Sequence, residues 1–85
     1  MNIDTTDASK RSEVLHNLVE HRKNSKMRQI DVAVAMGIGQ PAVSELERGE
    51  TSPKLETLQR YARAIGVTLN IYLSPTDIED GTSDD

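Results

Sequence analysis

The side chains that support enzyme chemistry are few in this chain and do not form known motifs. The two histidines, His16 and His21, are five residues apart, a spacing that does not place two metal ligands on one helix face. Ser44 has no histidine at the spacing of a nucleophile motif, and Gly37 and Gly39 alone form a turn rather than a phosphate-binding loop. The absence of cysteine excludes disulfides and thiolate metal sites. We therefore expect a protein that is not an enzyme and has no cofactor or metal.

Charge is distributed unevenly along the chain. The formal net charge is −4, but all ten lysines and arginines lie between Lys10 and Arg63. Residues 10–72 carry a net charge of +3, whereas residues 1–9 carry −2 and residues 73–85 carry −5. The local sign of the charge governs attraction to phosphates, so a basic middle segment is compatible with a nucleic-acid partner. We interpret the acidic ends as solubilising.

The chain is short and poor in aromatic residues. It has 85 residues, no Phe or Trp and two Tyr, so one small aliphatic core is expected. A chain of this size buries about 60–65% of its unfolded surface, and oligomerisation would help to stabilise it. No apolar run has the length of a signal peptide or membrane span, and the lack of cysteine fits a reducing compartment. The composition therefore predicts a cytoplasmic protein without a membrane partner.

Four segments have the apolar periodicity of amphipathic helices. The expected helices are at about 7–23, 29–36, 40–48 and 54–65. Gly37 and Gly49 follow the second and third, where a residue with positive φ often ends a helix. Pro41 is tolerated in the first turn of its helix, because an N–H there has no intrahelical partner. The residues expected to bury one face of the second helix are Ile30, Val32, Ala33 and Met36.

A period of two replaces the helical pattern near the C-terminus. Leu69, Ile71 and Leu73 alternate with Thr, Asn and Tyr, which is typical of a β-strand. A single strand in a helical domain lacks a partner, so we expect it to pair with the same strand of a second subunit. An extension without regular structure is the alternative. The predicted organisation is a disordered N-terminus at 1–6, a helical domain at 7–66, a dimerising strand at 67–74 and an acidic disordered tail at 75–85.

Two short helices joined by a tight glycine turn describe a helix-turn-helix unit. Between residues 22 and 66 the order and spacing of residues resemble the phage-repressor-like (Cro/XRE) helix-turn-helix family. The matching residues are Arg22, Gln29-Ile30-Asp31-Val32-Ala33, Gly37-Ile38, Val43-Ser44, Leu46-Glu47-Arg48-Gly49, Pro53, Leu55-Glu56-Thr57-Leu58, Ala62 and Ile65-Gly66. The resemblance implies an all-α, compact four-to-five-helix lambda-repressor-like DNA-binding domain at 7–66. Its partner would be double-stranded operator DNA, read by the helix at 40–48.

The resemblance assigns base contacts to the exposed face of the helix at 40–48. Gln40 is similar to glutamines that read adenine, because a Gln amide donates to N7 and accepts from N6. Pro41 and Ala42 would pack on a thymine methyl group. Ser44 would donate to a base or a phosphate, and Glu45 would accept from cytosine N4. The alternative for both Gln40 and Glu45 is a solvent-exposed side chain that makes no base contact.

The resemblance also implies phosphate contacts and one structural ion pair. The residues similar to phosphate contacts are Gln29, Arg48, Thr51, Ser52 and Lys54, and Arg28 is expected to add one. Backbone N–H groups at the start of the fourth helix would face the anion, which the helix dipole favours. Arg22 and Glu47 match a pair that forms an internal salt bridge, so we interpret both as structural.

Three positions depart from the family's pattern. Lys26 stands where glycine is frequent, and a positive φ at this position would cost some backbone strain. Arg28 and Gly39 stand where Ser or Thr is frequent, which weakens each helix cap by about 0.5–1 kcal/mol.

The small size and C-terminal strand resemble antitoxins of type II toxin–antitoxin pairs. That resemblance implies a homodimer that represses its own operon at a palindromic operator and binds a cognate toxin. The recognition helices of such a dimer would lie about 34 Å apart. A stand-alone phage or chromosomal regulator is the alternative, and a protein-interaction module that has lost DNA binding is a third.

Overall fold

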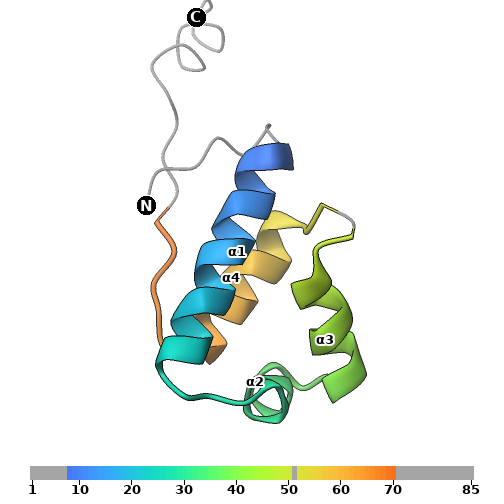
Figure 1. The fold of residues 1–85 in the computed structure, drawn as a ribbon, viewed down its shortest axis with the longest axis vertical. Coiled ribbons are helices and arrows are strands. Elements are labelled where there is room, and N and C mark those ends of the chain that lie inside the picture. The colour runs from blue at the N-terminus through green and yellow to red at the C-terminus, as the bar shows by residue number, and fades with distance from the viewer. Residues whose placement is uncertain (1–7, 51, 71–85) are drawn as a thin grey trace, which may run out of the picture.

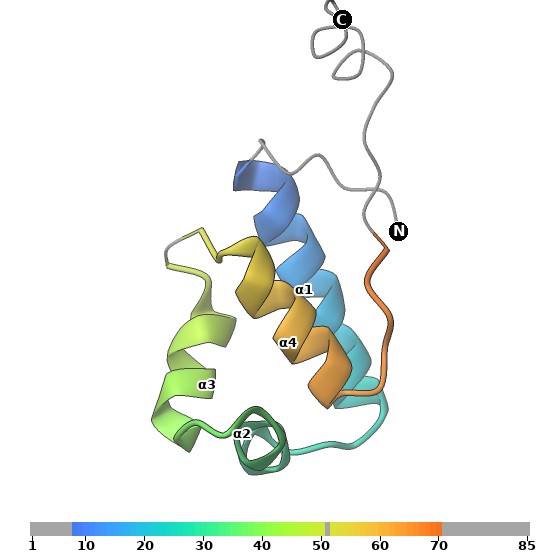
Figure 2. The ribbon, with the colours of Figure 1, turned by 180° about the vertical axis from the view of Figure 1, so that it is seen from behind.

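The computed structural model describes residues 8–50 and 52–70, and these residues form a bundle of four helices. The helices are α1 (Ala8–Asn24), α2 (Gln29–Met36), α3 (Gln40–Arg48) and α4 (Leu55–Ala64). Each boundary agrees with the sequence prediction to within one residue. In Figures 1 and 2, α1 and α4 lie side by side, α3 stands opposite them, and α2 crosses near one end. The predicted all-α fold is confirmed.

The core fills the space between the α1–α4 pair and the α2–α3 pair. Val32 of α2 and Val43 of α3 are fully buried, as are Leu58 and Tyr61 of α4. Burying a large apolar side chain stabilises a fold by about 1.5–3 kcal/mol. The remaining buried apolar residues are Val14, Leu15, Leu18, Val19, Ala33, Met36, Ala62 and Ile65. Val32 and Val43 therefore hold the two helices of the helix-turn-helix unit on the same core.

One residue predicted to be buried lies at the surface. Ile30 is 43% exposed, and Val34, one turn later on the same side of α2, is 75% exposed. Apolar residues occur on almost every side of this short helix, so periodicity does not distinguish its inner face. Packing against the other helices selects Val32, Ala33 and Met36 as the buried side. The prediction that Ile30 is buried is therefore wrong.

The turns on either side of α2 depend on unusual backbone angles and caps. Lys26 has a φ of 61°, a positive value that carries backbone strain for a residue other than glycine. Gly37 ends α2 with a φ of 72°. Arg28 supplies no capping oxygen, but the Asp31 carboxylate accepts a hydrogen bond from the Arg28 backbone N–H at 2.8 Å. This bond offsets part of the expected weakness of the cap.

Residues 67–70 continue beyond α4 and are in neither a helix nor a strand. Val67 and Leu69 are partly buried and pack against the core. Ile71 and Leu73 lie outside the described residues, as do segments 1–6 and 75–85, so the dimerising strand at 67–74 stays a prediction. Among the helices that the structure describes, none has the length and apolar character needed to cross a membrane.

Candidate nucleic-acid interface

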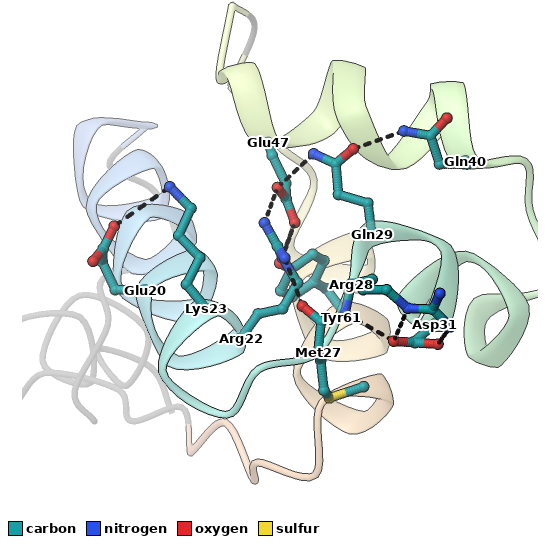
Figure 3. Close-up of polar contacts among 10 residues, drawn as sticks. All are labelled: Glu20, Arg22, Lys23, Met27, Arg28, Gln29, Asp31, Gln40, Glu47 and Tyr61. Atoms are coloured by element: carbon teal, nitrogen blue, oxygen red, sulfur yellow. Dashed lines mark hydrogen bonds and ion pairs between the residues drawn. The ribbon is translucent and has the colours of Figure 1, made fainter.

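The turn between α2 and α3 brings the first residues of both helices together. Gln29 begins α2 and Gln40 begins α3. The Gln40 Nε2 group donates a hydrogen bond to Gln29 Oε1 at 2.7 Å, as Figure 3 shows. Both side chains are partly exposed. The structure thus joins the residue predicted to read a base with one predicted to contact a phosphate.

Glu47, near the end of α3, is the centre of a buried polar cluster beneath this glutamine pair. Arg22 of α1 donates to it twice, from Nε to Oε2 at 2.7 Å and from Nη2 to Oε1 at 2.9 Å. Gln29 Nε2 donates to Oε1 at 2.9 Å, and the Tyr61 hydroxyl donates to Oε2 at 2.5 Å. The Arg22 and Glu47 side chains are only 9% and 6% exposed. The expected salt bridge is therefore present, and it joins α1 to α3.

The environment of the cluster shifts the pKa values of Glu47 and Tyr61 in opposite directions. Burial alone would raise the pKa of Glu47, but hydrogen bonds from Arg22, Tyr61 and Gln29 outweigh it and leave that pKa below its ordinary value. Burial, and next the hydrogen bond to Glu47, raise the pKa of Tyr61. At neutral pH Glu47 is therefore an ionised acceptor, and Tyr61 is a protonated donor.

The outer face of α3 carries the other predicted base contacts. Pro41, Ala42 and Glu45 are exposed, and Ser44 is partly exposed. Arg48 Nη1 donates to Ser44 Oγ at 3.3 Å, so the Ser44 hydroxyl keeps its own proton for donation. The face therefore combines small side chains with a few hydrogen-bonding groups, a set that a major groove accommodates.

Most of the predicted phosphate contacts that the structure describes are exposed. Arg28 Nη2 lies 3.0 Å from Asp31 Oδ1, and Arg48 Nε lies 3.5 Å from Glu50 Oε2. Exposed ion pairs of this kind contribute little to stability, so both arginines can exchange their partners for a phosphate. Ser52 and Lys54 are exposed, with Lys54 at the N-terminal cap of α4, and Thr51 lies outside the described residues.

The polar contacts that have no counterpart among the sequence-based predictions include two made by α4. The Tyr61 hydroxyl contacts Glu47, and Arg60 Nη2 donates to the Met36 carbonyl at 2.8 Å, at the end of α2. A tyrosine in an otherwise aliphatic core position was the available signal, because a buried hydroxyl needs a hydrogen-bond partner. Within the described residues, no three His, Cys, Asp or Glu side chains gather in a metal-binding arrangement.

Comparison with known proteins gives curated relatives from bacteria and a phage. The chain is 42% identical over 67 residues to antitoxin HigA1 of Mycobacterium tuberculosis, covering 79% of this chain and 45% of the relative. It is 45% identical over 56 residues to the HTH-type transcriptional regulator DdrOP3 of Deinococcus deserti, covering 66% and 43%. It is 33% identical over 60 residues to the ImmF control region 10 kDa protein of Bacillus phage phi105, covering 71% and 66%.

These matches cover only part of each relative. The chain spans less than half the length of the first two of these relatives. No solved structure matches the chain. Residues 18–72, which include all of α2, α3 and α4, match the family described as helix-turn-helix. The chain therefore belongs to the Cro/XRE-type helix-turn-helix family of DNA-binding domains.

Proposed function

We propose that the chain is a sequence-specific transcriptional regulator that places α3 in the major groove and reads an adenine with Gln40. The observation that carries the proposal is the hydrogen bond between Gln40 and Gln29, which holds the amide at the exposed start of α3. After this bond is made, Gln40 retains its oxygen and one N–H. These two groups match N6 and N7 of adenine.

The shape and charge of the surrounding surface support the same function. An α-helix with its side chains is about 10–12 Å wide, close to the width of a major groove. The exposed Pro41 and Ala42 allow close approach of the helix to the base edges. Arg28 precedes α2, Arg48 ends α3 and Lys54 precedes α4, and all three are exposed and would bind the phosphate backbone.

Replacing Gln40 with alanine tests the proposed readout. Preferred duplexes are first selected from a random pool with the full chain, and each base pair is then replaced in turn. We expect Gln40→Ala to lose about 1–3 kcal/mol of binding energy and to relax the base preference at one position. Lys54→Ala is the matched control, because loss of a phosphate contact weakens all duplexes alike. An equal loss on every duplex with Gln40→Ala would contradict the proposal.

We further propose that the regulator acts as a homodimer on a palindromic operator, through the strand at 67–74. Val67 and Leu69 pack against the core, so truncation after Asn70 is a cleaner test than removal of the whole strand. The truncated chain lacks Ile71 and Leu73, and we expect it to sediment as a monomer while keeping its helical circular dichroism. A truncated chain that is still dimeric in analytical ultracentrifugation would show that other residues form the interface.

The similarity to antitoxin HigA1 favours an autoregulating antitoxin that acts with a toxin protein in the cytoplasm. The similarity to DdrOP3 favours a regulator without a toxin partner. Co-expression with the product of the adjacent reading frame distinguishes them. Co-purification of a growth-inhibiting neighbour supports the antitoxin, and its absence supports the stand-alone regulator.

A further inference from the structure

A continuous chain of hydrogen bonds runs from the buried core to the exposed start of α3. It begins at Tyr61, which is fully buried and whose hydroxyl donates to Glu47 Oε2 at 2.5 Å. The other carboxylate oxygen of Glu47 accepts from Gln29 Nε2 at 2.9 Å, and Gln29 Oε1 accepts from Gln40 Nε2 at 2.7 Å. Figure 3 shows the four side chains in this order, leading from α4 through α3 and α2 back to α3.

The direction of each bond in this chain follows from the charge of Glu47. An ionised carboxylate only accepts hydrogen bonds, so Gln29 must turn its NH₂ group toward Glu47. The Gln29 carbonyl then faces Gln40, which must in turn direct its own NH₂ group toward Gln29. The orientation of the Gln40 amide, with its oxygen and its second N–H free to face a base, is therefore fixed, although Gln40 does not contact the carboxylate itself.

Tyr61 completes the set of donors that holds the carboxylate in place. Among the described residues, each oxygen of Glu47 accepts two hydrogen bonds, and Arg22 contributes one to each oxygen. Tyr61 supplies the second bond to Oε2, and Gln29 supplies the second bond to Oε1. Without the Tyr61 hydroxyl, Oε2 keeps one donor, and the carboxylate gains freedom to rotate away from Gln29.

We propose that Tyr61 is a positioning residue for base recognition, because its hydroxyl fixes, through Glu47 and Gln29, the direction in which Gln40 presents its amide. This inference rests on the proposed function of Gln40. Adenine offers a donor and an acceptor in the major groove, whereas guanine offers two acceptors. A Gln40 oxygen held toward the base therefore favours adenine and repels guanine, and a mobile amide discriminates less.

The test is Tyr61→Phe in the full chain, which removes only the hydroxyl and keeps the buried ring. Affinities are measured for the preferred duplex, for duplexes with the Gln40 base pair replaced, and for a scrambled duplex. We expect discrimination at the Gln40 base pair to fall by about threefold to tenfold, the effect of one hydrogen bond. Affinity for the scrambled duplex is expected to change little, because the charged phosphate contacts, Arg28, Arg48 and Lys54, do not belong to this chain of hydrogen bonds.

Two further variants separate positioning from a general loss of stability. Ile65→Val removes one methyl-sized group from the buried core directly after α4 and keeps every hydrogen-bonding side chain of the cluster, so it should leave discrimination unchanged. In a Gln40→Ala background, Tyr61→Phe should have no further effect on discrimination. An equal loss on all duplexes, the same loss in Ile65→Val, or an additional loss in the Gln40→Ala background would each overturn the role of Tyr61.

The outcomes also separate this inference from the proposed function. If Gln40→Ala changes a base preference and Tyr61→Phe does not, only the role of Tyr61 fails. If Gln40→Ala changes no base preference, the proposed function fails as well. Should Tyr61→Phe not fold, NMR of the unmodified chain decides the question. A slowly exchanging Tyr61 hydroxyl proton with dispersed Gln29 and Gln40 side-chain amide signals supports the inference, and signals typical of free glutamine overturn it.

Discussion

Replacing Glu47 with alanine is expected to lower the free energy of unfolding by about 3–5 kcal/mol, the cost of leaving a buried charge without its partner. The partner is Arg22, whose side chain is only 9% exposed. The donors of Tyr61 and Gln29 lose their acceptor in the same variant. Native proteins are stable by about 5–15 kcal/mol in total, so the loss would remove a large part of the stability of a domain this small. Urea denaturation followed by circular dichroism measures the loss.

Two controls assign this loss to the buried pair. Glu45→Ala removes an exposed acid from the same helix and should change stability by no more than about 0.5 kcal/mol. The double variant Arg22→Met, Glu47→Leu removes both buried charges and should be more stable than Glu47→Ala alone. If Glu47→Ala costs less than about 1 kcal/mol, the value of an exposed pair, then the buried cluster does not stabilise the fold as described.

The same pair predicts how stability depends on pH. The pKa of Glu47 is lower in the folded chain than its ordinary value of 4.5. Its contribution is therefore fully present above that ordinary value and is lost as the pH falls through the lower, folded-state pKa. Hydrogen bonds from Arg28 also lower the pKa of Asp31, which adds a loss of the same sign. We expect Glu47→Gln to remove the part of this acid sensitivity that comes from Glu47 and to leave the part that comes from Asp31.

DNA affinity is expected to fall steeply as the salt concentration rises, although the chain has a formal net charge of −4. Phosphate contacts release condensed counterions, and the predicted cationic contacts are Arg28, Arg48 and Lys54 in each subunit. The proposed homodimer would double this number, and a protein that neutralises six or more phosphates loses about 10³-fold in affinity between 50 and 200 mM salt. Lys54→Ala should reduce the slope of log affinity against log salt concentration by the contribution of about one phosphate contact per chain.

Much of the fold could be predicted from the sequence because local signals there agree with the tertiary structure. Gly37 marks the end of α2 through a backbone angle that glycine readily adopts, and Pro41 marks the first turn of α3. In α2, apolar residues occur on almost every side, so the apolar periodicity does not indicate which side of the helix faces the core. The exposure of Ile30 is therefore decided by how α2 packs against the other helices and could not be predicted from its own residues.

The candidate site was predictable as a set of residues but not as a network. The resemblance to the Cro/XRE family pairs Arg22 with Glu47 and places Gln29 and Gln40 at two helix starts. The resemblance does not indicate that Tyr61, in a helix distant in sequence, donates a hydrogen bond to the same carboxylate. Side-chain hydrogen bonds between helices depend on rotamers and on distances of a few ångströms. Such distances are settled only when all four helices have packed.

One binding measurement tests most directly whether α3 reads base pairs. The full chain is titrated at a single salt concentration with a duplex selected from a random pool and with a scrambled duplex of the same composition. If α3 reads base pairs, we expect a preference of about 10³-fold or more for the selected duplex. Equal affinity for the two duplexes would contradict it and would leave a helix-turn-helix fold that does not read a DNA sequence.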